Sequence, residues 1–262
     1  MDFAAIIENL QLFFLIFTRV FVMLSVAPLV SSTALPAIAR VALALFSAVT
    51  VVAWIQNYPV PDTGLEFVFM LFMEVIVGAT MGLFMVIIFT AFQLSGQFFS
   101  LQMGFSASQV FDPLAQIQIP LLGQFFNLIA MMVFLTVQGF QKLFLVGVLG
   151  SFERVRPWDF VKIRTGMLDY VLKATGAMFL NSLLIALPIV GTLMLVSLSM
   201  GLLAKASPQM NLLMLGFPIN ISISYIVIIM AMPFIISLFA NIIGQSFEFI
   251  MDIFTKAHGG PV

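Results

Sequence analysis

The sequence predicts an all-α, polytopic integral membrane protein with kinked or broken helices and helical hairpins, packed in a larger helical assembly. Of its 262 residues, 62% are hydrophobic and only 8% are charged. Soluble domains carry about 45–50% apolar and about 25% charged residues, so a soluble fold does not fit this composition. The chain also contains long apolar segments, and a helix needs about 20 such residues to cross the hydrocarbon core of a bilayer.

Six apolar segments are expected to form the membrane helices. They are Leu10–Val30, Pro36–Ile55, Leu65–Leu94, Gln124–Leu149, Val171–Ala204 and Gln209–Ile250. The last two segments are too long for one straight span. We expect Pro188 with Gly191 to divide Val171–Ala204, and Pro218 with Pro233 to divide Gln209–Ile250. Proline removes a helical hydrogen bond, and in lipid the freed carbonyl must find another partner. Ordinary kinked spans are the alternative to bent or hairpinned helices.

The most polar stretch, Gly150–Tyr170, holds four of the ten basic residues. The positive-inside rule places this stretch in the cytoplasm, and six spans would then put both termini there.

No motif in the sequence predicts an enzyme, a cofactor or a metal site. There is no cysteine, and the only histidine, His258, lies in a polar tail at residues 256–262. The run Gly104-Phe105-Ser106-Ala107-Ser108 approaches a nucleophile motif but lacks its final glycine. The net charge of −1 gives no indication of nucleic-acid binding.

Two ionisable residues fall inside predicted spans, Arg19 in the first and Glu74 in the third. Ionisable groups at membrane depth are candidates for function. Arg19 and Glu74 could pair across two helices, either as part of a proton or ion relay or as a single pair that orients the helices. We favour the orienting pair, because a coupled transporter would carry several carboxylates near the middle of the bilayer.

Small residues recur at a spacing of four, which allows two helices in a membrane to approach closely. The pairs are Gly78 and Gly82, Ser197 and Gly201, and Ala240 and Gly244. We expect close helix packing at these positions.

The segment Ser95–Gly123 is polar through amides and hydroxyls, with Asp112 as its only ionised group. Asp112-Pro113 is a turn signal. The mixture with phenylalanine and isoleucine fits irregular backbone that is buried in protein or lines a water-filled cavity. A structured loop on the membrane surface fits equally well.

Short motifs spread along the chain carry a resemblance to a known family. They are Gly104-Phe105-Ser106-x-x-Gln109-x-Phe111-Asp112-Pro113 followed by Pro120 and Leu128–Leu135, Arg19 with Ala27-Pro28 and Leu35-Pro36, Ala186-Leu187-Pro188-Ile189, and Met200-Gly201-Leu202-Leu203 with Ala206-x-Pro208-Gln209-Met210-Asn211 and Gly216-Phe217-Pro218. Together they resemble the FliR family of flagellar biosynthetic proteins and its relatives in virulence systems. The chain departs from the family near Gln138-Gly139, where members often have a glycine pair.

The resemblance implies a core subunit of the flagellar type III protein export gate, in the bacterial inner membrane at the flagellar basal body. It implies a complex with FliP and FliQ, with FlhA and FlhB on the cytoplasmic side, and unfolded proteins as the exported substrates. Residues 1–170 would be FliP-like and residues 171–255 a FliQ-like helical hairpin.

The resemblance also implies a pore plug within the segment 95–123. The residues expected to form it are Phe105, Ser106, Gln109, Phe111, Asp112, Pro113, Gln116, Gln118 and Pro120. The alternative function is a stand-alone secondary transporter or a small-solute channel, which would need internal repeats and a binding site at the bilayer midplane.

Overall fold

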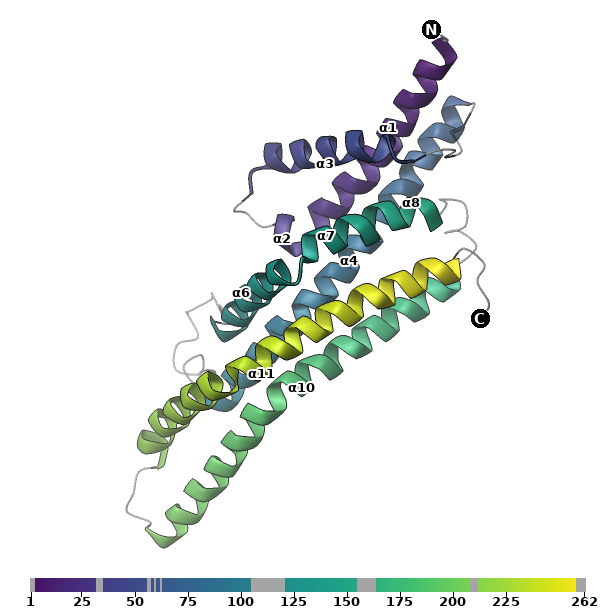
Figure 1. Ribbon diagram of the computed structural model, residues 1–262. Coiled ribbons are helices and arrows are strands. Elements are labelled where there is room, and N and C mark those ends of the chain that lie inside the picture. The colour runs from purple at the N-terminus through teal and green to yellow at the C-terminus, as the bar shows by residue number, and fades with distance from the viewer. Residues whose placement is uncertain are drawn as a thin grey trace, which may run out of the picture. The chain divides into compact units, whose positions relative to one another are not determined.

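The computed structural model describes residues 3–31, 35–55, 58, 60–61, 63–104, 121–154, 164–207 and 212–257 (Figure 1). Over these ranges the regular structure is helical throughout, which confirms the all-α prediction. The helices are α1 (Phe3–Val26), α2 (Pro28–Ser31), α3 (Ala37–Val52), α4 (Gly64–Met103), α6 (Leu121–Thr136), α7 (Gly139–Lys142), the π-helix η1 (Leu143–Leu149), α8 (Gly150–Arg154), α10 (Arg164–Ala206) and α11 (Leu212–Ala257).

Four described helices, α1, α4, α10 and α11, are long and apolar enough to cross a membrane, and α6 with α7–α8 would add a fifth as a broken span. This confirms a polytopic membrane fold but not the predicted six spans. The predicted second span forms only the 16-residue helix α3, which at 1.5 Å per residue is about 24 Å long and shorter than the hydrocarbon core.

The chain packs into two compact units that are each discontinuous in sequence. The first unit contains Met1–Ile87, Gln138–Thr175 and Gly244–Val262, and the second contains Ile88–Val137 and Gly176–Ile243. The helices α4, α10 and α11 run through both units. The predicted division into FliP-like and FliQ-like parts rests on resemblance, which helix packing does not test.

In the first unit, α1 packs with α3 and buries one face against the other helices. The buried residues of α1 include Leu12, Leu15, Ile16, Arg19, Val20 and Met23. They recur every three or four residues, which is the spacing of one face of an α-helix. Arg19 is therefore on the buried face, among apolar neighbours.

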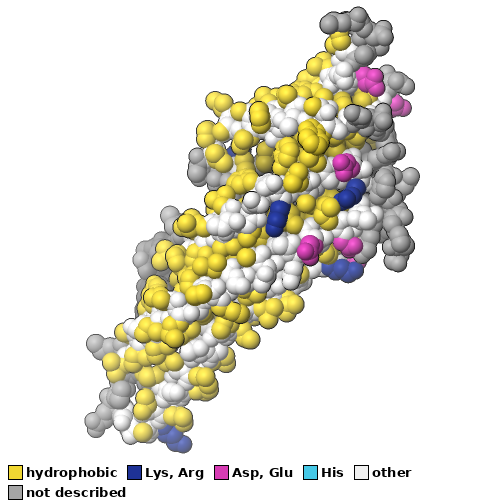
Figure 2. Space-filling model, viewed as in Figure 1, with side chains coloured by type: hydrophobic (Ala, Val, Ile, Leu, Met, Phe, Trp, Pro, Cys, Tyr) yellow, Lys and Arg dark blue, Asp and Glu magenta, His cyan; other side chains and the backbone are white. Residues whose placement is uncertain are grey.

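The core of the second unit is built from phenylalanine rings. Phe92 and Phe239 have ring centroids 4.2 Å apart, and Phe99 and Phe126 have centroids 4.8 Å apart. Large aromatic side chains fill such a core with much apolar contact and no charge. Among the described residues of this unit, only Lys205 carries a charge. Figure 2 shows the other dark blue and magenta side chains over helices of the first unit.

The prediction of irregular backbone over Ser95–Gly123 is wrong at both ends of this segment. Helix α4 continues through Ser95 to Met103, and α6 begins at Leu121. The buried spacing of α4 continues at Ser95, Phe99 and Met103. Ser95 also satisfies its hydroxyl locally by donating to the carbonyl of Phe92 at 2.7 Å. Uncharged polar residues therefore do not end this helix.

The prolines do not divide the long helices as expected. Pro188 lies inside α10, and Pro218 and Pro233 lie inside α11. All three prolines are exposed. In α10 the residues Ile185, Ile189 and Leu193 are buried on both sides of Pro188. The packing of this face stabilises the helix around Pro188, although the proline removes one helical hydrogen bond.

The expected span Gln124–Leu149 is instead broken near its middle. Helix α6 ends at Thr136, and α7 begins at Gly139. Between them Gln138 adopts a left-handed conformation with φ of 57°, which a residue other than glycine rarely takes. The π-helix η1 follows directly, and such segments are rare within α-helices.

Helices α10 and α11 form an antiparallel hairpin (Figure 1). Residues 207–211 separate them in sequence, and at their other ends the rings of Tyr170 and Phe249 have centroids 6.1 Å apart. Helix α11 runs to Ala257, so the start of the predicted tail at residue 256 belongs to the helix. His258 lies outside the described residues.

Candidate functional site

Arg19 of α1 and Glu74 of α4 form an ion pair inside the first unit. The Nε group of Arg19 donates a hydrogen bond to Oε2 of Glu74. Arg19 is 1% exposed and Glu74 is fully buried. The structure thus brings together the two ionisable residues that the sequence singled out in the spans.

Two hydroxyl groups complete the polar network around this pair. Arg19 donates from Nη1 to Oγ of Ser151 at 3.0 Å and from Nη2 to the hydroxyl oxygen of Tyr58 at 3.2 Å. Tyr58 donates its proton to Oε1 of Glu74 at 2.6 Å. Ser151 donates to the carbonyl of Val148 at 2.7 Å. Both carboxylate oxygens of Glu74 therefore accept a hydrogen bond.

Phe152 supplies an aromatic face for the guanidinium group. The central carbon of the Arg19 guanidinium lies 3.8 Å from the Phe152 ring centroid, within the range of a cation–π contact. The Tyr58 ring meets the same Phe152 ring edge to face at 5.6 Å. The planar arginine is thus held by hydrogen bonds in its plane and by a ring on its face, which a lysine could not reproduce.

The network joins four parts of the chain, namely α1, the segment around Tyr58, α4 and the start of α8. We call Arg19, Tyr58, Glu74, Ser151 and Phe152 the Arg19 network. Every member is buried, and the carboxylate of Glu74 lies against the guanidinium group of Arg19, so the two opposite charges offset each other. A buried pair with these partners is suited to orient the elements that carry it, and among the described residues both carboxylate oxygens of Glu74 are occupied by donors of the network. The geometry therefore fits the orienting role better than the relay.

Sequence reasoning missed Tyr58, Ser151 and Phe152. Tyr58 lies in a proline-containing loop, and Ser151 and Phe152 lie at the beginning of the polar stretch after the fourth apolar segment. Their types give no functional signal in isolation. The only usable signal is that a buried arginine has five donors and requires more acceptors than one carboxylate offers.

Gly78 and Gly82 lie where α4 approaches α1 closely. A Cβ atom added to Gly78 would lie 2.4 Å from the backbone oxygen of Arg19, and one added to Gly82 would lie 2.5 Å from Cβ of Val26. Only glycine leaves room for this approach. The Gly78 contact falls at Arg19 itself, so the helix approach and the ion pair belong to one arrangement.

At the other two small-residue pairs, the described part of the chain shows no comparable close approach to the glycines. Ser197 and Gly201 are exposed, and an added Cβ at Gly201 or Gly244 would meet nothing within 4 Å. A close approach that sequence reasoning missed occurs in the second unit, between Gly96 of α4 and Gly123 of α6. An added Cβ at Gly96 would lie 2.7 Å from Cα of Gly123.

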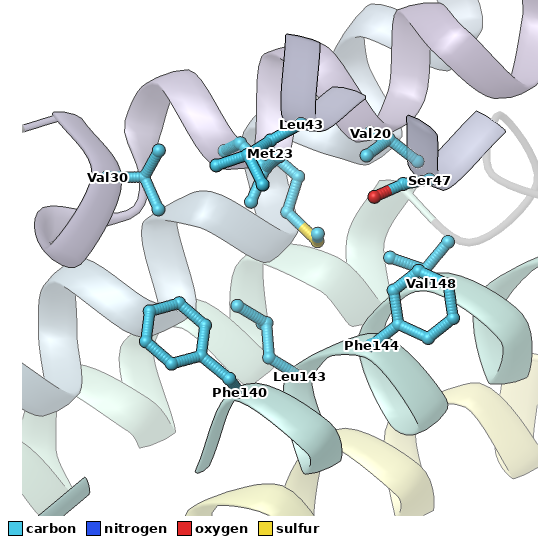
Figure 3. A pocket seen from close by; sticks show the side chains of 10 residues that line it. Val20, Met23, Val30, Leu43, Ser47, Phe140, Leu143, Phe144 and Val148 are labelled. Atoms are coloured by element: carbon cyan, nitrogen blue, oxygen red, sulfur yellow. The ribbon is translucent and has the colours of Figure 1, made fainter. Parts of the chain in front are cut away.

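A pocket of about 210 Å³ opens between α1, α3 and the α7–η1 region. Figure 3 shows Met23, Leu43, Phe140 and Leu143 among its lining side chains, with the Ser47 hydroxyl as a polar contribution. Its lining carries no ionisable group. No group of three or more metal-ligating side chains occurs among the described residues either.

The residues expected to form the pore plug, Phe105 to Pro120, lie outside the described residues. The structure shows only the two helix ends that flank them. Helix α4 ends at Met103, and the following residue, Gly104, has a positive φ of 88°. An added Cβ at Gly104 would lie 2.5 Å from the ring of Phe217, so this exit from α4 requires glycine.

Together, the long apolar helices and the buried pair define the class, which is a polytopic α-helical membrane protein with an Arg–Glu pair enclosed in its helix packing. The family model of bacterial export proteins, family 1, matches residues 10–246, and the chain belongs to this family. It is 31% identical over 208 residues to flagellar biosynthetic protein FliR of Bacillus subtilis (strain 168), covering 79% of this chain and 80% of that protein. It is 27% identical over 201 residues to the protein of the same name in Escherichia coli (strain K12), covering 77% and 76%. The resemblance predicted from the motifs is confirmed.

Removing one side of the buried pair should destabilise the first unit strongly. Arg19→Met leaves the Glu74 carboxylate buried without its cation, which typically costs about 3–5 kcal/mol. Arg19→Met with Glu74→Leu removes both charges and should lose less stability than Arg19→Met alone. Thermal unfolding of the detergent-extracted protein measures both.

Lys173→Met is the matched control for Arg19→Met. Lys173 pairs with Asp169 at 2.7 Å, but both side chains are more than half exposed, and such pairs contribute about 0–1 kcal/mol. Equal losses for Arg19→Met and Lys173→Met would contradict the network, as would a double variant less stable than Arg19→Met.

Gly78→Ala should separate α1 from α4, because the added methyl group would overlap the backbone of Arg19. Overpacking of this kind typically costs about 1–3 kcal/mol. Gly201→Ala adds the same methyl group in open space and should leave stability unchanged or slightly higher, since alanine favours helices over glycine. Thermal unfolding that ranks the two variants in the opposite order would refute the close approach.

Proposed function

We propose that this chain is a core subunit of the protein export gate of the bacterial flagellum, located in the inner membrane at the flagellar basal body. Membership of the bacterial export family over residues 10–246 carries this proposal. The relatives named flagellar biosynthetic protein FliR, which match about four-fifths of the chain, favour the flagellar branch. The role is non-enzymatic, and other components of the apparatus supply the energy for export.

We further propose that the chain works inside a hetero-oligomer with FliP and FliQ, with FlhA and FlhB close by. The support is the exposed apolar surface of α10, which a single chain leaves uncovered. Its large exposed side chains include Phe179, Leu180, Leu183, Leu187, Leu195 and Leu198. Exposed apolar patches of this extent mark protein or lipid contacts. Ser197 and Gly201 lie on this helix and would allow close approach by a partner helix.

The hairpin of α10 and α11 is the part that we propose to be FliQ-like, with residues 1–170 as the FliP-like part. The support is that α10 and α11 pair with each other through a short connection, as a separate two-helix partner would. In this proposal the chain combines features of both kinds of subunit.

Residues 105–120 are proposed to plug the closed pore. Their two flanks are held in the second unit, because the backbones of α4 and α6 meet at Gly96 and Gly123. A segment with fixed ends can fill a pore and swing aside without moving the helices that carry it. Its polarity comes from amides and hydroxyls, with Asp112 as the one charge. A desolvated ion pair in the plug would add several kcal/mol to the free energy of opening the pore, because opening would break it.

The assembly state distinguishes the gate from a stand-alone transporter or channel. A gate subunit should purify in detergent within a large hetero-oligomer and lose stability when expressed alone. Purification as a stable monomer whose melting temperature rises with a small solute would favour the transporter instead.

The plug can be tested without disturbing the helices. Replacing residues 106–119 by a glycine–serine sequence of equal length keeps Gly104 and the start of α6 but removes the plug side chains that lie between Phe105 and Pro120. The reconstituted complex should then leak ions, measured as the loss of a potassium gradient across vesicles. The control replaces residues 258–262 by a glycine–serine sequence of equal length, and vesicles with this variant should keep the potassium gradient. A tight membrane after the 106–119 replacement, with the complex intact, would refute the plug.

A further inference from the structure

The apolar pocket of the first unit has a buried floor and an exposed rim. Val20, Met23 and Val148 are at most 2% exposed and form the floor. Leu43 of α3 and Phe140 of α7 are 47% and 44% exposed and form the rim. Figure 3 shows the side chains of α1 and α3 on one side of the pocket and those of α7 and η1 on the other. The pocket therefore opens outward between two rows of apolar side chains.

The π-helix η1 builds most of one wall of this pocket. Its residues Leu143, Phe144 and Val148 all line the pocket. In an α-helix, two residues five positions apart point about 140° away from each other, so Leu143 and Val148 would not share a side. The i→i+5 hydrogen bonds of a π-helix widen the turn and bring such residues to one side. Because π-helices are rare and occur frequently at functional sites, the wall indicates a formed site and not a packing defect.

An apolar occupant fits the pocket better than water does. The pocket has a volume of about 210 Å³, and apolar protein cavities of about 150 Å³ stay dry and bind benzene. A buried water needs about two to four polar partners, whereas the hydroxyl of Ser47 is the one polar side-chain group in the described lining. An empty pocket would leave its walls without van der Waals partners. We therefore expect a hydrocarbon group to occupy it.

The size of the pocket selects a flexible chain over a helix. A helix with its side chains is about 10–12 Å across, so a single turn already fills more than about 400 Å³. This exceeds the volume of the pocket about twofold. The long apolar helices make this chain a membrane protein, and the acyl chains of phospholipids are the flexible hydrocarbon that a membrane supplies.

A positive charge lies on α3 beside the rim. Arg40 precedes Ser47 by seven residues, which is just under two turns, so the two residues lie on the same side of α3 with Leu43 between them. Arg40 donates from Nη2 to the carbonyl of Leu35 at 3.1 Å, which holds its guanidinium group at this end of the helix. The elements α2, α3, α7 and η1 contain no acidic residue. Arginine is well suited to bind phosphate groups.

We propose that the pocket binds one acyl chain of an anionic phospholipid, whose phosphate group lies at Arg40. We call it the α3–η1 lipid site. The bound chain fills the space between α3 and η1 and contacts α1 at the floor, so the lipid stabilises the first unit. This inference rests on the membrane fold and the pocket, and it does not depend on the proposed export function.

Photo-cross-linking locates the acyl chain in the full protein within its complete complex. The probe is phosphatidylglycerol with a diazirine group in the middle of one acyl chain, used in vesicles that contain the complex. After irradiation, mass spectrometry should find the lipid on the peptides that contain Met23, Leu143 and Phe144. Cross-links found only at side chains outside the pocket would overturn the lipid site, and a partner side chain that fills the pocket would produce that result.

Ser47→Phe fills the pocket from α3, and Val49→Phe is its matched control. Val49 is 62% exposed, and residues two positions apart point about 160° away from each other on a helix. Ser47→Phe should lose the cross-links at Met23 and Leu143, whereas Val49→Phe should keep them. Equal cross-linking of these residues in both variants would contradict the site. If Ser47→Phe does not fold, the positions of the cross-links in the unaltered chain decide the question.

The head group is tested with phosphatidylcholine that carries the same diazirine chain. One arginine near the membrane surface favours an anionic lipid by about fivefold in affinity. Phosphatidylglycerol should therefore label the pocket about fivefold more than phosphatidylcholine, and Arg40→Gln should remove the difference. Equal labelling by the two lipids in the unaltered chain would overturn the anionic head group. A preference that persists in Arg40→Gln would overturn the position of the phosphate.

Discussion

The cost of burying a charge governs the first unit of this protein. Arg19 cannot lie inside apolar helices unless its donors find acceptors, and the surrounding residues supply Glu74, Tyr58 and Ser151 within hydrogen-bonding distance. These partners come from segments far apart in sequence. Satisfying one guanidinium group therefore fixes how α1, α4 and α8 meet, and the glycine at position 78 is what allows α1 and α4 to approach so closely.

The second unit is held together by different means, and the contrast explains the composition of the chain. Its described residues carry a single charge, Lys205, and its core is made of phenylalanine rings around Phe92, Phe126 and Phe239. The second unit flanks the proposed plug. Its helix surfaces pack through aromatic rings, so they can separate without breaking a buried ion pair. A first unit joined by the Arg19 network and a second unit whose described residues carry a single charge are compatible with the proposed gate, in which only the plug moves.

The sequence predicted the helical membrane class and singled out Arg19 and Glu74 as two residues that could pair, because composition and rare intramembrane charges are strong signals. It failed where tertiary packing overrides local preference. Pro188 was expected to divide α10, but buried neighbours on both sides carry the helix through it. Gln138 breaks a span with no proline present, through a left-handed backbone that residue type does not reveal. Tyr58 and Ser151 could not be found, since only the fold brings them to the arginine.

Hydrogen exchange in an Arg19→Lys variant tests most directly whether the Arg19 network holds these segments together. Lysine keeps the positive charge but cannot donate in the plane of a guanidinium group. If the network is the common anchor, backbone amides of α1 near residue 19, α4 near residue 74 and α8 should all exchange faster, while those around Phe126 and Phe239 stay unchanged. Faster exchange confined to α1, with α4 and α8 as protected as in the native chain, would contradict the account.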